Sequence, residues 1–343
     1  MRVEVIQPVG ISVCIARYEN VNPRVNKAFV LGAGMGERLR PLTDQLPKPL
    51  IPVFQKPLIT YAFDHLLAAG FREFVVNTHH IPEAYARTFP DQTYRGAPIQ
   101  FRHEAPVRLE TAGGIANVRD LLGEEPFIVY NGDILTDLPL DKLLQEHRKR
   151  GNMVTLGLRS QGSALHISLD SDTGLVTDIR GKLGTGKEGE FLFTGIYVVE
   201  PEFFQWLTPG KVESVIPIFL NLIQQKHRLG GVVVDEGEWW DLGSRSSYLD
   251  AHRALQEKGA SFPAYAKIEE TGRCLCDAGA TVSPDANLHG TNVISAGCTV
   301  GPGAKLTDCI LWPGAQVAAG ATLQRCIVRS GVTASGAHSE CDF

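Results

Sequence analysis

The residues best suited to chemistry lie close together near the start of the chain, in the stretch LGAGMGERLRPLTDQLPKPLIPV (31–53). Its alternate glycines, at positions 32, 34 and 36, leave room for backbone N–H groups to close around an anion. Three cations, Arg38, Arg40 and Lys48, follow within the same stretch, which is more than a neutral turn requires. The stretch therefore predicts a phosphate-binding loop, with a glycine turn beside a solvated basic patch as the alternative.

Two common phosphate loops do not fit this spacing. A dinucleotide fingerprint, G-x-G-x-x-G, would need a glycine at the position that Glu37 occupies. A P-loop would end in Gly-Lys-Ser/Thr, and this stretch does not. The apolar segment AFVL (28–31) precedes the glycines and predicts a short strand that leads into the loop.

The stretch resembles the signature of the sugar-1-phosphate nucleotidylyltransferases, G-x-G-x-R-L-x-P-L-T followed by P-K-P. The matching residues are Gly34, Gly36, Arg38, Leu39, Pro41, Leu42, Thr43, Pro47, Lys48 and Pro49. Glu37 stands where most members carry Thr. With LETAGG (109–114), it is similar to the N-acetylmuramate-1-phosphate uridylyltransferases, whereas the whole-chain architecture is similar to the mannose-1-phosphate guanylyltransferases.

The resemblance implies that an NTP and a sugar 1-phosphate are condensed to an NDP-sugar and pyrophosphate. It leaves two substrate pairs open: GTP with mannose 1-phosphate, and UTP with a hexose- or muramate-type 1-phosphate. A non-catalytic regulatory paralogue that binds nucleotide sugar is the alternative from another class, although such a protein would be expected to lose the cationic or metal residues. A further alternative, acyl transfer with His289 as base, would need more repeats than the chain supplies.

Catalysis of this reaction requires charge neutralisation and alignment, because both reactants are anionic. In that light Arg38 can brace the β- and γ-phosphates, and Lys48 can reach the α-phosphate. Asp133 ends the strand-like segment FIVYNGD (127–133), and Asp241 lies in WWDLG (239–243), which resembles the family's second metal segment. Carboxylate oxygens suit Mg²⁺, so the expected cofactor is Mg²⁺ held by both aspartates. Capping of a turn or a helix is the alternative for each of them.

The nucleotide is expected on the glycine loop and on HEAPVRLETAGG (103–114), which resembles the family's base and sugar segment. Glu104 is acceptor-only when ionised and can take N–H groups of uracil or guanine. Ion pairs of Glu104 or Glu110 with Arg102 or Arg108 are the alternative. The expected nucleotide-binding residues are Leu31, Gly32, Ala33, Gly34, Met35, Gly36, Glu104, Thr111, Gly113 and Gly114.

The sugar phosphate is expected near Asn131, Lys182, Thr194 and Gly195. Lys182 lies in GLVTDIRGKLG (174–184), which resembles a family segment that ends in Glu-Lys-Pro. Gly181 replaces the Glu that contacts sugar hydroxyls in that segment, so the sequence leaves the sugar open.

These residues require a scaffold, and the pattern from 27 to 258 supplies one. Short β-branched runs alternate with amphipathic segments, which predicts an α/β domain with a Rossmann-like open mixed sheet, of the GT-A-like nucleotidyltransferase type. The segment PLITYAFDHLLAAG (57–70) predicts a helix with Pro57 in its first turn, FVVN (74–77) a strand, and SSYLDAHRALQEKG (246–259) the last helix. Ligands bind at the carboxyl ends of such strands.

A second architecture follows. The aliphatic residues Val282, Leu288, Ile294, Val300 and Leu306 recur every six positions, and the period resumes at Val317 and Leu323. This hexapeptide pattern predicts a left-handed parallel β-helix of roughly four coils of about 18 residues. The expected divisions are an extension of unknown role (1–26), the catalytic domain (27–258), a linker (259–271), the β-helix (272–338) and a tail (339–343). Exposed terminal coils favour a homo-oligomer formed through the β-helix.

Charge and hydropathy indicate which classes of partner the chain can bind. The net charge of −5 argues against a general affinity for nucleic acid, and small polyanions are the expected partners. No apolar run approaches the length of a membrane span and the start lacks a signal-peptide pattern, so no membrane is expected and the cytoplasm is the expected location. The seven cysteines are expected to be free thiols, since Cys274 and Cys276 lack the spacing of a zinc site.

Overall fold

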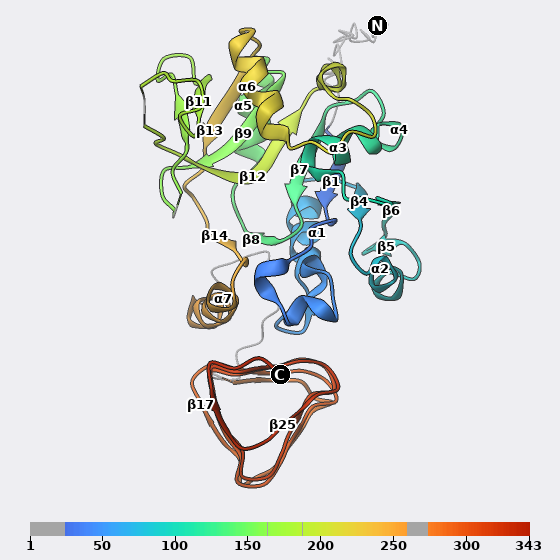
Figure 1. The fold of residues 1–343 in the computed structure, drawn as a ribbon, viewed down its shortest axis with the longest axis vertical. Helices are drawn as coiled ribbons and strands as arrows, with labels where there is room; N and C mark the ends of the chain where they lie inside the picture. Colours follow the sequence, from blue (N-terminus) through green and yellow to red (C-terminus); the bar gives the residue numbers. More distant parts are fainter. Residues whose placement is uncertain (1–24, 163, 187, 259–273) are drawn as a thin grey trace, which may run out of the picture.

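The computed structural model describes residues 25–162, 164–186, 188–258 and 274–343. A mixed sheet covered by helices forms the upper part of Figure 1, and a triangular β-helix forms the lower part. The predicted extension (1–26) lies outside the described residues except for Val25 and Asn26, and the predicted linker (259–271) lies entirely outside them. Among the described helices, none has the length and apolar character that a membrane span requires.

The large sheet has eight strands in the order β13-β9-β12-β7-β1-β4-β6-β5. They are β1 (Lys27–Leu31), β4 (Glu73–Thr78), β5 (Thr93–Tyr94), β6 (Ala97–His103), β7 (Phe127–Asn131), β9 (Val154–Arg159), β12 (Leu192–Val199) and β13 (Leu229–Val233). Strand β12 runs antiparallel to both of its neighbours and β5 runs antiparallel to β6, while the other pairs are parallel. The predicted open mixed sheet is confirmed.

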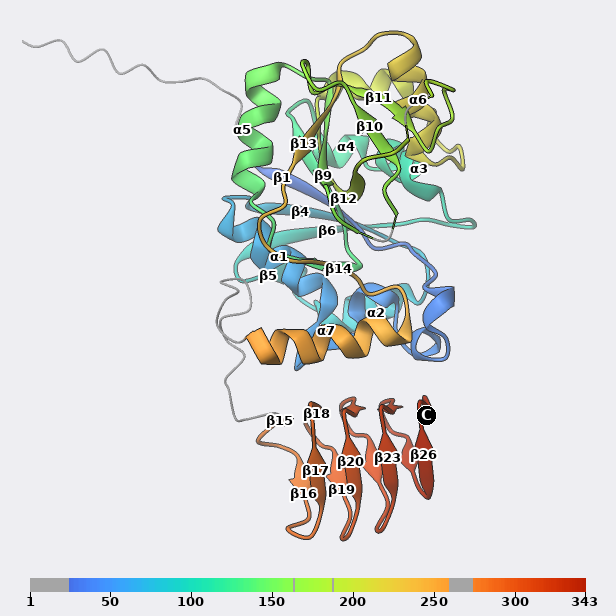
Figure 2. The same ribbon diagram turned by 90° about the vertical axis from the view of Figure 1, so that its left-hand side faces the viewer.

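Helices cover both faces of this sheet (Figures 1 and 2). One apolar layer includes side chains of α1 (Leu58–Ala68), α2 (Pro82–Thr88) and α5 (Leu140–Arg150), and the other those of α3 (Glu110–Asn117), α4 (Arg119–Leu122) and α6 (Val215–Gln224). Successive residues of β1 alternate between the layers, since Ala28 and Val30 pack in the first and Phe29 in the second. Burial on both faces explains why the predicted strands read as continuous apolar runs.

Helix α1 shows how local sequence sets an element's ends. Pro57 was predicted in the first turn but is the N-cap, and Ala69 is the C-cap. Gly70 follows with φ +98°, a conformation that glycine adopts without steric cost. The predicted helix is therefore confirmed, with its start one residue later than predicted.

Strand β1 lies at the point where the chain reverses its direction across the sheet. After β1 the chain builds β4 and β6 on one side, and it then returns to β7 on the other side. The parallel register places Leu31 opposite both Asn77 and Asn131, so the carboxyl ends of β1, β4 and β7 lie together. Such a switch point is where open α/β sheets bind ligands.

Smaller elements surround this edge. The loop after β1 contains the 3₁₀ turns η1 (Glu37–Leu39), η2 (Leu42–Asp44) and η3 (Lys48–Leu50), and then the hairpin of β2 (Pro52–Val53) and β3 (Lys56–Pro57). Strand β8 (Ile134–Thr136) pairs antiparallel with β14 (Trp239–Asp241), which leads into α7 (Arg245–Lys258). The remaining elements are the hairpin of β10 (Ile167–Leu169) and β11 (Val176–Ile179) and the 3₁₀ helix η4 (Pro201–Trp206).

The β-helix has four coils that form three parallel four-stranded sheets. The first sheet contains β15 (Cys274–Cys276), β18 (Asn292–Ile294), β21 (Ile310–Leu311) and β24 (Ile327–Val328). The second contains β16 (Thr281–Val282), β19 (Thr299–Val300), β22 (Gln316–Val317) and β25 (Thr333–Ala334). The third contains β17 (Asn287–His289), β20 (Lys305–Thr307), β23 (Thr322–Gln324) and β26 (Ala337–Ser339). These stacked sheets confirm the predicted β-helix and fit its left-handed form.

The register of the coils explains the break in the six-residue period. Leu288 pairs with Leu306, whereas Leu306 pairs with Leu323, so the later coil is one residue shorter than the predicted length. The turn after β20 is the shorter one, since Ile310 stands opposite Val293 although β20 ends at Thr307. The aliphatic ladder continues through this change.

The first sheet of the β-helix packs against the catalytic part (Figure 2). Val293, Ile310 and Trp312 share one apolar cluster with residues of the loop after β1 and of α7. Trp312 is fully buried, and its Nε1 donates a hydrogen bond to the Tyr248 hydroxyl at 3.1 Å. The β-helix therefore forms part of the surroundings of the loop.

Candidate active site

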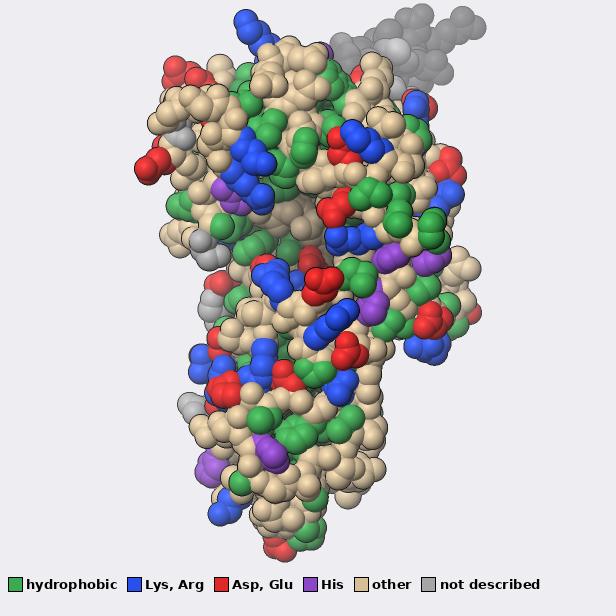
Figure 3. Space-filling view, viewed as in Figure 1, with side chains coloured by type: hydrophobic (Ala, Val, Ile, Leu, Met, Phe, Trp, Pro, Cys, Tyr) green, Lys and Arg blue, Asp and Glu red, His purple; other side chains and the backbone are tan. Residues whose placement is uncertain are grey.

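A cleft of about 390 Å³ opens at the carboxyl ends of β1, β4 and β7. In Figure 3 charged side chains of both signs border the hollow in the middle of the molecule. The cleft is lined by Leu31, Ala33, Gly34, Met35, Gly36, Glu37, Arg38, Leu39, Lys48, Pro49, Asn77, Glu104, Arg108, Glu110, Thr111, Asn131, Asp133 and Gly243. The glycine loop and the base segment predicted from sequence therefore border one cleft.

Four charged side chains meet on one side of this cleft. Lys48 Nζ lies 2.8 Å from Asp133 Oδ2 and 3.0 Å from Asp241 Oδ1. Arg38 Nη2 lies 3.5 Å from Asp241 Oδ2. The Lys48 side chain is only 6% exposed, whereas the carboxylates are 37% and 41% exposed. The structure thus brings together all four residues predicted to be catalytic.

Secondary structure explains this convergence. Lys48 opens η3 between two prolines, and Asp133 lies two residues after the end of β7. Asp241 is the last residue of β14 and stands opposite Ile134, so the β8–β14 pairing carries it to Asp133. Gly243 permits the close approach of Arg38, because a Cβ there would lie 2.5 Å from Arg38 Nη2.

The three glycines of the loop have different reasons to be glycine. A Cβ at Gly32 would lie 2.6 Å from the Asn77 carbonyl oxygen, and Gly36 has φ +64°. Gly34 lines the cleft, and a Cβ there would meet nothing within 4 Å. Close packing therefore accounts for Gly32 and backbone conformation for Gly36, whereas Gly34 leaves open space for a ligand.

Buried hydrogen bonds hold the start of this loop. The Gly32 N–H donates to Asn77 Oδ1 at 2.8 Å, and the Tyr85 hydroxyl donates to the Gly32 carbonyl at 2.8 Å. Burial, and then the nearby charge of Asp133, raise the pKa of Tyr85, so the hydroxyl stays protonated and keeps donating. The loop is thereby fixed to β4 and α2.

Glu104 lies at the floor of the cleft and is 1% exposed. Its Oε1 accepts from Asn77 Nδ2 at 2.7 Å, and its Oε2 accepts from the Leu109 N–H at 2.7 Å. Among the described residues Glu104 forms no ion pair with Arg102, which pairs with Asp120 at 2.5 Å. The alternative is confirmed for Glu110, which pairs with Arg108 at 2.5 Å. Each oxygen keeps further acceptor capacity.

Asn77 connects these parts and was missed in the sequence analysis. Its Oδ1 holds the Gly32 N–H and its Nδ2 holds Glu104, so one amide joins the glycine loop to the base segment. A detectable signal existed: Asn77 is the first polar residue after the apolar run of β4, as Asn131 is after that of β7. The pair Arg108–Glu110 at the cleft was considered only as the alternative to base recognition.

Replacing Glu104 by Gln is expected to destabilise the fold. The new amide NH₂ would face either the Asn77 amide donor or the Leu109 N–H, which leaves a buried donor unpaired. We expect a loss of about 1–3 kcal/mol in the free energy of unfolding, measured by denaturant titration. The control is Glu83→Gln, which changes an exposed Glu on α2; equal stability of the two variants would contradict these roles of Glu104.

Comparison with known proteins identifies the scaffold. Residues 27–258 match the family model described as nucleotidyl transferase. The chain belongs to this family. It is 34% identical over 218 residues to an N-acetylmuramate alpha-1-phosphate uridylyltransferase of Neisseria meningitidis serogroup B, which covers 64% of this chain and 93% of that protein.

Two further relatives align over more of the chain. A mannose-1-phosphate guanylyltransferase of Mycobacterium tuberculosis is 31% identical over 303 residues, which covers 87% of this chain and 83% of that protein. A UTP–glucose-1-phosphate uridylyltransferase of Synechocystis is 26% identical over 335 residues, which covers 87% of this chain and 85% of that protein. The similarity to named guanylyl- and uridylyltransferases agrees with the reaction class that the sequence predicted.

In this nucleotidyl transferase, several predicted nucleotide-binding residues have structural roles. Thr111 lines the cleft, and its hydroxyl also accepts from the Val215 N–H at 2.7 Å. A Cβ at Gly113 would lie 2.2 Å from the Lys211 carbonyl oxygen. A Cβ at Gly114 would lie 3.0 Å from Glu104 Oε1. The two glycines therefore allow close packing. Neither of them belongs to the described lining of the cleft.

The residues predicted for the sugar phosphate are less concentrated. Asn131 lines the cleft, and Gly195, with φ +81°, leaves room for its amide, since a Cβ there would lie 2.4 Å from Asn131 Nδ2. The Thr194 hydroxyl is buried and donates to the Gly157 carbonyl at 2.8 Å. Lys182 is exposed and outside the described lining of the cleft. Their roles toward a sugar phosphate stay predictions.

Proposed function

We propose that the chain transfers a nucleotidyl group from an NTP to a sugar 1-phosphate and releases pyrophosphate. The convergence of Arg38, Lys48, Asp133 and Asp241 beside an open glycine loop supports this most strongly. These are the charges that two anionic reactants require, and a non-catalytic paralogue would not need all of them. The names of the relatives support the same reaction class.

The proposed chemistry requires no covalent protein intermediate. A phosphate oxygen of the sugar 1-phosphate attacks the α-phosphorus, the bond from that phosphorus to the bridging oxygen breaks, and pyrophosphate leaves. We infer that Arg38, which lines the cleft and is 74% exposed, holds the β- and γ-phosphates. Lys48 would face the α-phosphate, where charge develops in the transition state.

The carboxylates fit a divalent metal. Asp133 and Asp241 both contact the same ammonium, so their oxygens already converge on one cation position. Among the residues described, no group of three or more His, Cys, Asp or Glu could hold a metal. Two carboxylates with water and substrate phosphates suit Mg²⁺, which retains several waters and seldom uses an all-protein cage. When bound, Mg²⁺ would neutralise charge on the NTP phosphates.

The base and sugar are tested together by assaying four NTPs against mannose, glucose and N-acetylmuramate 1-phosphates, with pyrophosphate release as the readout. We expect UTP or GTP to be used and CTP and ATP to be poor, since the remaining acceptor capacity of Glu104 favours a ring N–H donor. Release of pyrophosphate with none of the pairs would contradict the enzyme and favour the regulatory paralogue.

We further propose a homo-oligomer formed through the β-helix. Outward residues of two of its sheets are polar, as at Thr299, Gln316 and Lys305. At the ends of these two sheets, β16, β17, β25 and β26 have a strand partner on one side only among the described residues, so a second copy could pack on their free edges. Light scattering of the full chain should give at least a dimer, whereas a monomer at working concentration would rule this out.

A further inference from the structure

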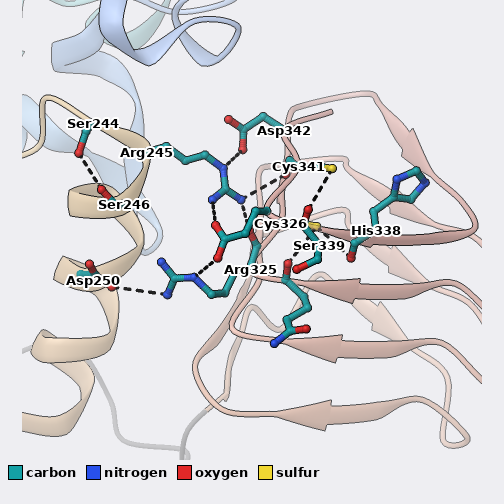
Figure 4. Close-up of polar contacts among 12 residues, drawn as sticks. Ser244, Arg245, Ser246, Asp250, Arg325, Cys326, His338, Ser339, Cys341 and Asp342 are labelled. Carbon is teal, nitrogen blue, oxygen red and sulfur yellow. Dashed lines mark hydrogen bonds and ion pairs between the residues drawn. The ribbon is translucent and has the colours of Figure 1, made fainter.

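The beginning of α7 is joined to the end of the β-helix through Arg245 (Figure 4). Its Nε donates to Asp342 Oδ1 at 2.6 Å, its Nη1 pairs with Glu340, and its Nη2 donates to the Arg325 carbonyl. All three guanidinium nitrogens therefore have partners between residues 325 and 342. The Arg245 side chain is 21% exposed and that of Asp342 is 12% exposed, so solvent screens this pair less than an ordinary surface pair.

A second arginine, Arg325, also binds Glu340. Arg325 Nε donates to Glu340 Oε1 at 2.6 Å, and its Nη1 lies 3.5 Å from Asp250 on α7. We call Arg245, Arg325, Glu340 and Asp342 the tail clamp. Because its members come from α7, the last coils and the tail, the clamp holds α7 against the β-helix.

The same end of the β-helix also contacts the glycine-rich loop. Arg329 Nη1 donates to the Pro41 carbonyl at 3.1 Å, and Gln45 Nε2 donates to the Ser330 carbonyl at 3.3 Å. Pro41 and Gln45 both lie between Arg38 and Lys48 in the chain. Residues 325–330 thus touch the loop that carries Arg38 and Lys48 and the helix that follows Asp241.

Only three residues separate the clamp from Asp241, and the first and the third of them are held. Leu242 is fully buried. Ser244 caps α7 through reciprocal hydrogen bonds with Ser247, each at 3.1 Å. A displacement of Arg245 would therefore move Asp241 rather than be absorbed by a loose connection.

We propose that Arg245 is a positioning residue for Asp241, and that Glu340 and Asp342 hold it in place. The inference rests on the proposed function, because it assigns Asp241 to the metal. Without the clamp, the first turn of α7 can shift, and the two carboxylates converge less often on one cation position. The β-helix would then contribute directly to metal binding at a site in the other part of the chain.

The test compares Arg245→Met with wild type in the full chain. We expect the Mg²⁺ concentration for half-maximal turnover to rise about tenfold, the low end of the effect of residues that orient metal ligands. The kcat at saturating Mg²⁺ should change by less than about twofold. Backbone amides from 241 to 248 should exchange hydrogen faster, which is a readout independent of turnover.

Two further variants make the result specific. Arg253→Met removes another α7 ion pair, between Arg253 and Asp250 at 3.3 Å, and should behave like wild type. The double variant Glu340→Gln, Asp342→Asn should reproduce Arg245→Met without changing α7 itself.

A lower melting temperature with unchanged Mg²⁺ dependence and unchanged exchange at 241–248 would overturn the inference and leave Arg245 a merely structural contact. If wild type forms no NDP-sugar with any substrate pair, the proposed function fails instead. Hydrogen exchange still decides whether the clamp orders the Asp241 segment in that case.

Discussion

Replacing Asp133 by Asn is expected to remove nearly all turnover while leaving the fold intact. The amide keeps the shape of the side chain but loses the charge that pairs with Lys48 at 2.8 Å and that would hold Mg²⁺. The buried Lys48 ammonium keeps Asp241 at 3.0 Å, so the substitution leaves no buried charge without a partner. Since metal stabilisation is worth several kcal/mol, turnover should fall at least about a hundredfold.

The matched control for Asp133→Asn is Asp137→Asn, four residues further along. Asp137 Oδ1 accepts from the Glu238 N–H at 2.6 Å, and an Asn keeps that acceptor. The turnover of Asp137→Asn should stay within about threefold of wild type. Comparable turnover in Asp133→Asn and Asp137→Asn, with unchanged thermal unfolding in both, would contradict the role given to Asp133.

Replacing Lys48 by Met should have two opposite effects. Turnover should fall about a hundredfold, because the charge that faces the α-phosphate is lost. Binding of a divalent cation to the nucleotide-free protein should instead become tighter. In the structure the Lys48 ammonium contacts both carboxylates, at 2.8 and 3.0 Å, and therefore occupies the position where the metal should bind. The buried alkyl stem is retained in Met, so packing changes little.

The gain in affinity is measured with Mn²⁺ as the probe, by the electron paramagnetic resonance signal of the free ion. Loss of one competing ion pair of about 1.4 kcal/mol would strengthen binding about tenfold. Lys142→Met serves as the control, because Lys142 also pairs with a carboxylate, Glu236 at 2.7 Å, but outside the described cleft lining. Equal or weaker Mn²⁺ binding by Lys48→Met would contradict competition between the ammonium and the metal.

Local pattern was sufficient for much of the fold. The helix at 57–70 and the strands at 74–77 and 127–133 followed from apolar runs bounded by Pro, Gly and polar residues, which are local signals, although the last strand ends at Asn131. The six-residue period likewise identified the β-helix. The one-residue contraction between Leu306 and Leu323 was visible only as a break in that period, because turn length is set by coil stacking.

The site was less predictable where it depends on distant pairing. Asp241 reaches Asp133 only through the β8–β14 ribbon, whose register no local pattern determines. Position 113 requires glycine because the Lys211 carbonyl packs against it, and Lys211 lies in a loop about a hundred residues further along the chain. The partners of Arg245 come from the tail, and charge alone did not distinguish them from other acidic residues. Sequence therefore identified most of the charged groups, whereas the tertiary structure defined their neighbours.

In the proposed reaction a nucleotidyl group moves from the NTP to the sugar phosphate. The most direct measurement follows the label from [α-³²P]NTP and [γ-³²P]NTP, supplied separately with the best sugar 1-phosphate and Mg²⁺. The α label is expected in NDP-sugar and the γ label in pyrophosphate, both at rates that Asp133→Asn lowers at least about a hundredfold. Transfer of the γ label to the sugar, or release of labelled inorganic phosphate without NDP-sugar, would contradict the proposed reaction.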